Sequence, residues 1–102
     1  MALIRFAYSK QAAVDLKDIY TYGFKTFGAA QAEHYNAGLR SSVEIAASFP
    51  LIGRVYQTET GDVFRCYNSG RHMIFYRVEN DWLLVIRILH SSMDFDRHLR
   101  RH

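Results

Sequence analysis

Apolar residues dominate the last third of the chain. Residues 71–78 and 82–89 are rich in β-branched, aromatic and leucine side chains, and only the polar segment 79–81 separates them. Two such segments joined by a short turn are expected to pair as an antiparallel hairpin. Arginines recur among these residues, so we expect one face of the hairpin to be apolar and the other basic. A basic face of this kind indicates a macromolecular partner.

The first half of the chain follows a helical period. Residues 2–8 predict an opening strand, and Ser9 is a favoured N-cap for a helix that begins near Lys10. Gly28 interrupts the period, and a second helix is expected to end at Phe49-Pro50. The two helices would form an αα-hairpin. The stripe predicted to face the core comprises Ala12, Ala13, Leu16, Ile19, Tyr20, Gly23, Phe24 and Phe27 on the first helix, and Ala32, Tyr35, Leu39, Val43 and Ala46 on the second.

The remaining segments complete an α+β pattern. Residues 51–62 lack a period and predict a loop. Strands are expected at 63–67, 71–78 and 82–89, with a hairpin turn at 68–70, and a short, frayed helix is expected at 94–101. The order is β-α-α-β-β-β(-α), with the N-terminal strand and the helical hairpin packed on an antiparallel sheet.

Length and composition limit the classes that fit. The 102 residues suit a single domain, residues 1–102, that buries about 60 to 65% of its unfolded surface. The net charge is +3 and the pI about 9.2, less basic than a dedicated nucleic-acid binder. All three lysines precede residue 26, whereas every Lys or Arg from Arg40 onward is arginine, which suits forked and stacked contacts.

Cysteine and histidine usage indicates a cytoplasmic protein without a metal. Cys66 is the only cysteine, so no intrachain disulfide can form, and we expect it to be a small buried apolar residue. The five histidines lack ligand spacing, and no cofactor or metal is expected. The sequence shows neither a signal-peptide pattern nor an apolar segment long enough to span a bilayer.

Four motifs in this order resemble the ParE branch of the RelE/ParE toxin superfamily. The resemblance covers nearly the whole chain. The motifs are Tyr8-Ser9 before Ala12 to Leu16, the segment Phe49-Pro50-Leu51-Ile52-Gly53-Arg54, residues 72–78, and residues 86–94.

The resemblance implies a toxin of a type II toxin-antitoxin module that is neutralised by a ParD-like antitoxin. The expected target is DNA gyrase, which toxins of this branch trap while the DNA is cut. The RelE branch instead cleaves messenger RNA on the ribosome, so the fold alone does not decide the function. A third alternative is a relative that has lost toxicity and only binds its antitoxin.

The residues favour binding over RNA cleavage. A ribonuclease needs groups that activate the 2′-hydroxyl, stabilise the phosphate and protonate the leaving oxygen. The chain has no lysine after Lys25 and no tyrosine after Tyr76, and Ser91 follows His90 where the nuclease branch would favour a tyrosine. The groups that could still hold a phosphate are Arg65, Arg77, Arg87 and His90. We therefore expect a binding protein rather than an enzyme.

Several candidate target-binding residues have structural alternatives. His90 is a general acid, a recognition residue, or a cap that ties the turn 91–94 to the sheet. Arg77 and Arg87 form either a binding patch on one face or a pair neutralised by an acidic neighbour, for which Glu79, Asp81 and Asp94 are the candidates. Residues 97–102 form the densest basic stretch, in which Arg97, Arg100 and Arg101 either contact DNA near the gyrase site or keep the terminus soluble.

The candidate antitoxin-binding residues are spare apolar side chains and nearby arginines. Val14, Tyr22 and Ile45 lie off the helical stripes and are expected on the outer surface. An acidic antitoxin tail that docks as a helix in a groove or as an added strand would complement Arg54 and Arg71, together with Arg65 and Arg77. We expect the isolated chain to be poorly soluble and its melting midpoint to rise with its partner.

Overall fold

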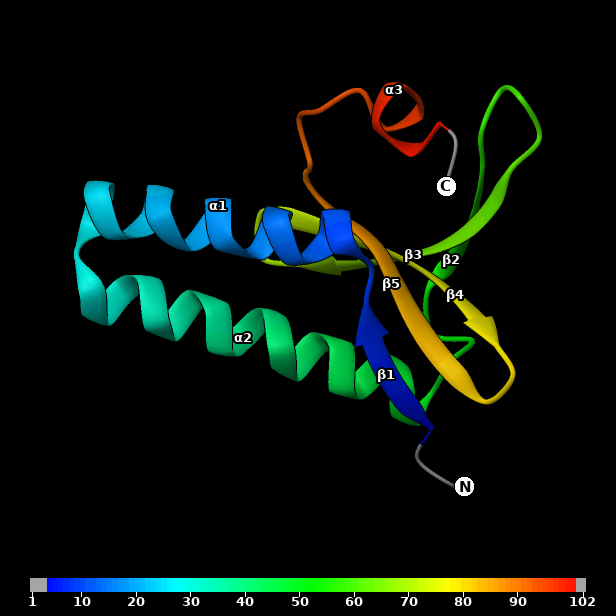
Figure 1. Ribbon diagram of the computed structural model, residues 1–102, viewed down its shortest axis with the longest axis horizontal. Helices are drawn as coiled ribbons and strands as arrows, with labels where there is room; N and C mark the ends of the chain where they lie inside the picture. Colours follow the sequence, from blue (N-terminus) through cyan, green and yellow to red (C-terminus); the bar gives the residue numbers. More distant parts are fainter. Residues whose placement is uncertain (1–3, 101–102) are drawn as a thin grey trace.

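The computed structural model describes residues 4–100, in which two helices cover one face of a five-stranded sheet (Figure 1). The elements are β1 (Arg5–Tyr8), α1 (Lys10–Phe27), α2 (Ala29–Ser48), β2 (Arg54–Gln57), β3 (Val63–Ser69), β4 (His72–Glu79), β5 (Trp82–His90) and α3 (Phe95–Leu99). The α+β class and the predicted order of helices and strands are confirmed, and β2 is an additional strand.

The strand order is β1-β5-β4-β3-β2, so the last strand of the chain lies inside the sheet. Strands β2 to β5 pair antiparallel, whereas β1 pairs parallel to β5, from Arg5 opposite Trp82 to Tyr8 opposite Val85. The N-terminal strand is therefore an edge of the sheet, and the sheet is mixed at that edge.

Helix α1 continues the hydrogen bonding of β5 where β1 ends. Ser9 donates its backbone N–H to the Val85 carbonyl and its hydroxyl to the Ile86 carbonyl, and the same hydroxyl accepts from Ala12 N–H as the N-cap of α1. One turn later, the Asp15 carboxylate accepts from the Ile88 N–H at 2.9 Å. Backbone groups of β5 that β1 does not reach are thereby satisfied by the beginning of α1.

Both faces of the sheet are apolar, so the expectation of one basic face is wrong. The helix-side cluster includes Leu39, Val43 and Tyr76. The opposite cluster includes Phe64, Phe75 and Leu99, the last brought in by α3. Because β4 and β5 lie inside the sheet and are covered on both faces, their arginines must find polar partners within the structure.

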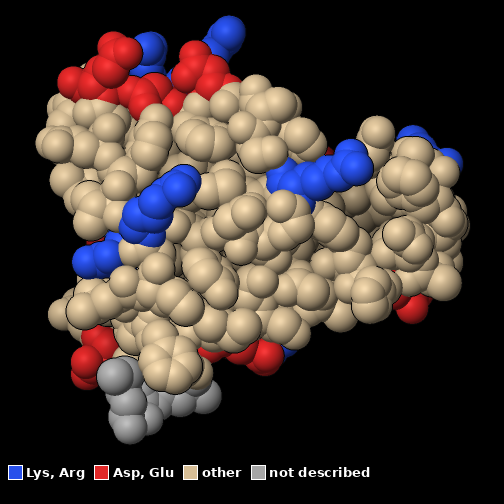
Figure 2. Space-filling view, turned by 180° about the vertical axis from the view of Figure 1, so that it is seen from behind, with Lys and Arg blue, Asp and Glu red and all other residues tan. Residues whose placement is uncertain are grey.

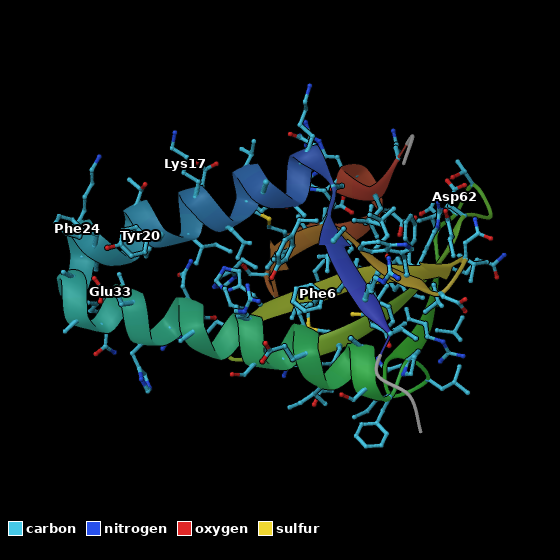
Figure 3. The ribbon with its side chains drawn as sticks, turned by 60° about the horizontal axis from the view of Figure 1, so that its bottom comes forward. Phe6, Lys17, Tyr20, Phe24, Glu33 and Asp62 are labelled. Atoms are coloured by element: carbon cyan, nitrogen blue, oxygen red, sulfur yellow. The ribbon has the colours of Figure 1, made fainter. Side chains whose placement is uncertain are left out.

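The stripe of α1 that was predicted to face the core includes residues that are exposed in the structure. Ala12 is fully buried, but Ala13 is exposed, and Phe24 and Phe27 are 50% and 65% exposed. The reason is that the outer half of the helical hairpin extends past the end of the sheet, so the stripe has no sheet to cover there. Figure 3 shows Tyr20 and Phe24 at this outer end, whereas Phe6 lies between β1 and α2.

The segment expected to be a loop contains the edge strand β2, which pairs with β3. Its approach is fixed by Tyr76, whose hydroxyl donates to the Pro50 carbonyl at 2.7 Å and accepts from Gly53 N–H at 3.0 Å. A Cβ at Gly53 would lie 2.7 Å from that hydroxyl, so only glycine fits. Arg65 completes the anchor by donating to the Gly53 carbonyl at 2.6 Å.

The expected turn at 68–70 is shifted. Asn68 and Ser69 still pair with β4, and the reversal occurs at Gly70 and Arg71, with Gly70 at φ 60°. The terminal helix is shorter than expected and is not frayed, because Leu99 is fully buried against the sheet. Among residues 4–100, no helix combines the length and apolar character that a membrane span requires.

Candidate functional site

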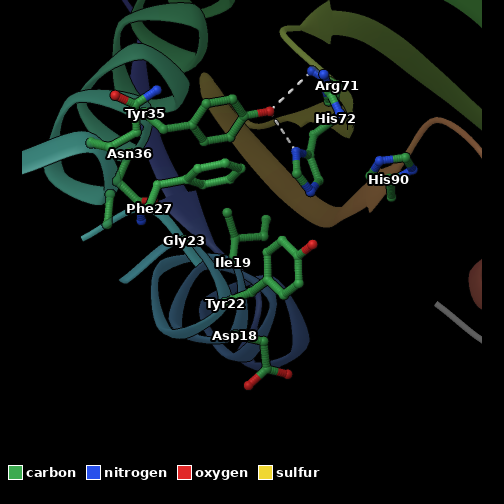
Figure 4. Close-up of a pocket in the computed structure, with 12 residues that line it drawn as sticks. Asp18, Ile19, Tyr22, Gly23, Phe27, Tyr35, Asn36, Arg71, His72 and His90 are labelled. Carbon is green, nitrogen blue, oxygen red and sulfur yellow. Dashed lines mark hydrogen bonds between the residues drawn. The ribbon is translucent and has the colours of Figure 1, made fainter. Parts of the chain in front are cut away.

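A pocket of about 600 Å³ lies between the helical hairpin and the β3–β4 turn, and we call it the hairpin pocket (Figure 4). Its apolar walls are Ile19, Tyr22, Gly23, Phe27, Ala32 and Tyr35. Its polar residues are Asp18, Gln31, Asn36, Arg71, His72 and His90. The protruding hairpin and the end of the sheet diverge here, whereas α1 and α2 approach each other closely where Gly23 faces Ala32.

Tyr35 fixes the sheet side of the pocket. Its hydroxyl accepts from the Arg71 backbone N–H at 3.0 Å and lies 2.6 Å from His72 Nδ1. Since the hydroxyl accepts from Arg71, its own proton is available to a neutral His72 ring. Burial, followed by the charge of His90, lowers the pKa of His72, whereas Asp15 acts in the opposite direction. A neutral His72 that accepts from Tyr35 is consistent with both observations.

His90 lies beside His72, with the two ring centroids 5.4 Å apart in an edge-on arrangement. Its Nδ1 accepts from Ser92 N–H at 3.1 Å and lies 2.7 Å from the Ser92 hydroxyl. Of the three roles considered for His90, this geometry corresponds to the cap that ties the turn to the sheet. The same ring also borders the hairpin pocket.

Arg87 is engaged inside the structure. Its Nε and Nη2 donate to the two carboxylate oxygens of Asp15 at 2.8 and 2.9 Å, and its Nη1 donates to the His98 carbonyl at 3.1 Å. Both side chains are 12% exposed. The proposed neutralisation of Arg87 by Glu79, Asp81 or Asp94 is therefore wrong. Its partner is Asp15 of α1, which lies outside the apolar stripe predicted for that helix.

The other sheet arginines point in different directions. Arg77 donates its Nε to the Val63 carbonyl at 3.1 Å, and its guanidinium lies 4.3 Å from the Phe64 ring centroid, on the α3 side. Arg65 bonds the Gly53 carbonyl on the side of Tyr76, which faces the helices. The structure does not bring Arg65 and Arg77 together with Arg87 and His90.

Arg97 lies in α3, and Arg100 is its C-cap residue. Arg97 and Arg100 are exposed, and the Arg97 N–H donates to Asp94, the N-cap of α3. Arg101 lies outside the described residues. The Tyr56 hydroxyl and Glu59 N–H both donate to Asp96, which fixes α3 to the β2–β3 segment and lowers the pKa of Asp96.

Two of the candidate antitoxin-binding residues meet in the hairpin pocket. Tyr22, 68% exposed, and Arg71 both line it, whereas Val14, Ile45 and Arg54 are exposed elsewhere. Sequence reasoning missed Tyr35 and His72 as pocket residues. Tyr35 fits the helical stripe, and no signal in the sequence shows that the stripe leaves the sheet at this point.

A second apolar area surrounds the β2 edge. Its exposed residues are Phe49, Leu51, Ile52, Val55 and Val63. Seen from behind, the molecule presents a mostly uncharged surface with separated basic side chains, and its carboxylates gather at the margins (Figure 2). Cys66 is 3% exposed, as expected for a small apolar residue, and burial raises the pKa of its thiol while Arg54 opposes the shift.

The arrangement offers binding surfaces rather than a metal centre. Between Ile4 and Arg100, no three His, Cys, Asp or Glu side chains come together to hold a metal ion. In the hairpin pocket, His72 and His90 are hydrogen-bonded to Tyr35 and Ser92, and the apolar side chains Tyr22 and Phe27 are exposed. These are properties of a surface that receives side chains of a partner.

Comparison with known proteins identifies the class of protein. Residues 6–95 match the family described as "ParE toxin of type II toxin-antitoxin system, parDE". The chain is 37% identical over 91 residues to Toxin ParE1 of Caulobacter vibrioides, covering 89% of this chain and 93% of that protein. It is 35% identical over 96 residues to Toxin ParE1 of Mycobacterium tuberculosis, covering 93% and 97%. The chain belongs to the ParE toxin family, within the RelE/ParE superfamily.

Solved structures share the fold. A chain of the chromosomal ParDE system of P. aeruginosa superposes with a TM-score of 0.72 at 17% identity, covering 88% of this chain and 98% of that chain. A chain of the RelBE2 toxin-antitoxin complex of Mycobacterium tuberculosis superposes with a TM-score of 0.62 at 14% identity, covering 88% and 100%. The expected RelE/ParE-like fold is thereby confirmed.

Proposed function

We propose that this ParE-type toxin acts by binding DNA gyrase and blocking replication, and that a ParD-like antitoxin neutralises it by direct contact. The family match and the ParE1 relatives support the toxin assignment over nearly the whole chain. Antitoxin binding is supported by the ParDE and RelBE2 systems in which chains of this fold occur.

The observation that favours binding over bond cleavage is that the charged side chains are bonded to other groups within the protein. A phosphate-cleaving centre needs several cations and an acid or base directed at one position. Here Arg87 is held by Asp15, and His90 Nδ1 is occupied by Ser92. Arg65 and Arg77 bond backbone carbonyls on opposite faces of the sheet. Because these charged side chains are separated in space, they favour a protein that binds a target over one that cleaves RNA.

The decisive experiment adds the purified chain to gyrase and supercoiled plasmid and measures linear DNA after the protein is digested. We expect linear DNA only when both toxin and gyrase are present, and its loss when the product of the neighbouring antitoxin gene is added first. Ribosome-bound messenger RNA is incubated with the same preparation in parallel. Cleaved transcript with intact plasmid would instead support the RelE-type ribonuclease.

A binding measurement separates a toxin from a relative that has lost toxicity. A partner that binds only the folded state increases the free energy of unfolding by mass action, by about 2.7 kcal/mol when its concentration is one hundred times its Kd. The melting midpoint rises as a result. We expect the antitoxin to produce such a shift. A shift without any effect on gyrase would indicate the non-toxic alternative, and the absence of a shift would contradict the proposed neutralisation.

A further inference from the structure

We propose that the hairpin pocket is a binding site for a guanine nucleoside monophosphate, with the phosphate at the sheet end of the pocket and the base directed toward Asp18 of α1. The site is additional to the proposed toxic activity and depends on neither gyrase nor the antitoxin. Its basis is a group of hydrogen-bond donors at one end, exposed aromatic walls, and a carboxylate at the other end.

The ring of His72 directs an N–H group into the pocket. Its Nδ1 lies 2.6 Å from the Tyr35 hydroxyl, which accepts from the Arg71 backbone N–H and keeps its own proton for His72. The alternative acceptor of that proton, the Ser69 carbonyl, is 3.5 Å away. In the neutral imidazole the ring proton is therefore on Nε2. Figure 4 shows this edge of the ring, opposite Tyr35, facing the interior of the pocket.

His90 and Arg71 add further donors at the same end. The Ser92 backbone N–H donates to His90 Nδ1 at 3.1 Å, so the proton of the neutral His90 ring is also on Nε2. The two histidine rings lie edge-on with their centroids 5.4 Å apart, and both line the pocket. Arg71 is exposed, lines the pocket and forms no ion pair within residues 4–100. This end therefore presents donors from three side chains.

An anion with several acceptor oxygens suits these donors. Burial, followed by the charge of His90, lowers the pKa of His72 and favours its neutral ring. A bound phosphate would accept from both rings, and its charge would favour their protonation. The carboxylate that acts on His72, Asp15, is already bound by Arg87 and does not compete. The terminal oxygens of a phosphate monoester can bind the arginine fork and the histidine donors together.

The walls next to these donors suit a base. Tyr22 and Phe27 are 68% and 65% exposed, although they line a concavity of about 600 Å³. Small-molecule pockets commonly have about 300–1,000 Å³ and mainly apolar walls with a few polar groups. A base stacked on these rings would remove them from water. A ligand that joins a base to a phosphate thus matches both parts of the pocket.

The carboxylate at the far end selects the base. Figure 4 places Asp18 at the end opposite Arg71. An ionised carboxylate only accepts hydrogen bonds. Guanine carries adjacent N–H donors on its Watson–Crick edge, whereas adenine carries a donor next to an acceptor, which Asp18 would repel. The same charge disfavours further phosphates at this end, so the ligand is a mononucleotide rather than a polynucleotide.

Calorimetry on the purified toxin measures the Kd of guanosine 5′-monophosphate. We expect a Kd between about 10 µM and 1 mM. Guanosine and inorganic phosphate should each bind at least about tenfold more weakly, because each lacks one half of the contacts. Adenosine 5′-monophosphate should also bind about tenfold more weakly. A guanosine oligonucleotide with a 5′-phosphate should bind no more tightly than the mononucleotide.

Single substitutions locate the site. Arg71→Gln and Tyr22→Ala should each weaken binding of guanosine 5′-monophosphate by about tenfold. Asp18→Asn should reduce the preference for guanine over adenine. Arg97→Gln and Phe24→Ala are matched controls, because both residues are exposed and neither lines the pocket. Unchanged melting midpoints of the free variants would show that the fold is retained.

NMR of the imidazole groups provides a readout that does not require a variant. The nucleotide should shift the Nε2 resonances of His72 and His90 and leave those of His34, exposed on α2, unchanged. No saturable binding up to about 10 mM nucleotide would overturn the site. Equal losses in the pocket variants and their controls would also overturn it. Equal affinity for the adenine nucleotide would overturn the role of Asp18, and tighter binding of the oligonucleotide would overturn the assignment to a mononucleotide.

Discussion

Asp15 and Arg87 are 72 positions apart in the sequence and form a two-point ion pair with distances of 2.8 and 2.9 Å. The pair joins the first turns of α1 to β5, and the same carboxylate accepts the Ile88 N–H that β1 does not reach. One side chain thus completes the sheet ladder and neutralises an arginine that would otherwise be buried without a partner.

Removal of Asp15 should be costly. Asp15→Ala leaves a largely buried guanidinium without its partner and the Ile88 N–H without an acceptor, so we expect a loss of about 3–5 kcal/mol in the free energy of unfolding. Urea denaturation measures it. The control is Glu44→Ala, which breaks the exposed Arg40–Glu44 pair and should cost no more than about 0.5 kcal/mol. Equal losses in the two variants would show that the buried pair has no special role.

The Tyr76 hydroxyl should stabilise the entry into β2. Tyr76→Phe removes a donor to Pro50 and an acceptor for Gly53 in a buried position, so we expect a loss of about 1–3 kcal/mol. Tyr67→Phe is the control, because its hydroxyl makes no hydrogen bond to other residues in the range 4–100. Hydrogen exchange of β2 amides should accelerate in Tyr76→Phe. Unchanged exchange would contradict an anchoring role.

Stability should fall below pH 6.5 because of His72. Its pKa is lowered in the folded state, mainly by burial, so the unfolded chain binds a proton first as the pH falls. The contribution of His72 is therefore complete above pH 6.5 and is lost progressively below it. We expect His72→Asn to flatten the decline of the melting midpoint between pH 7 and 5, whereas His34→Asn, at an exposed site on α2, should leave it unchanged. A parallel decline in all three proteins would rule out His72.

The terminal helix should be part of the core rather than a mobile basic tail. Leu99 is fully buried with Phe75 and Phe64, so Leu99→Ala should cost about 2–5 kcal/mol. Met93→Ala is the comparison, since Met93 is 45% exposed and its truncation should cost well under 1 kcal/mol. A loss below 0.5 kcal/mol in Leu99→Ala, about the size of an ordinary surface substitution, would indicate that α3 detaches readily.

The sequence predicted the elements better than their contacts. The helical period, the Ser9 cap and the β-rich segments are local signals, and they located both long helices and four of the five strands. The partnership of Asp15 with Arg87 is not local. A helical wheel assigns a lone carboxylate to solvent, and only the parallel pairing of β1 with β5 brings the two residues together.

The site was predicted only in part for a similar reason. Tyr22 was recognised because it lies off the stripe, and Arg71 because an acidic antitoxin tail would complement an arginine. Their convergence depends on how far the helical hairpin extends past the sheet, which no local pattern records. Tyr35 was assigned to the core, although it is only half-buried and its hydroxyl is hydrogen-bonded to His72, which lines the hairpin pocket. Strand β2 was missed because its four residues carry few apolar side chains.

The position of β5 between β1 and β4 has a consequence for synthesis of the protein. Residues 82–85 are translated more than 70 residues after their strand partner, residues 5–8. The sheet cannot close until β5 has been made, so a nascent chain that stops before this strand should stay open and be readily degraded.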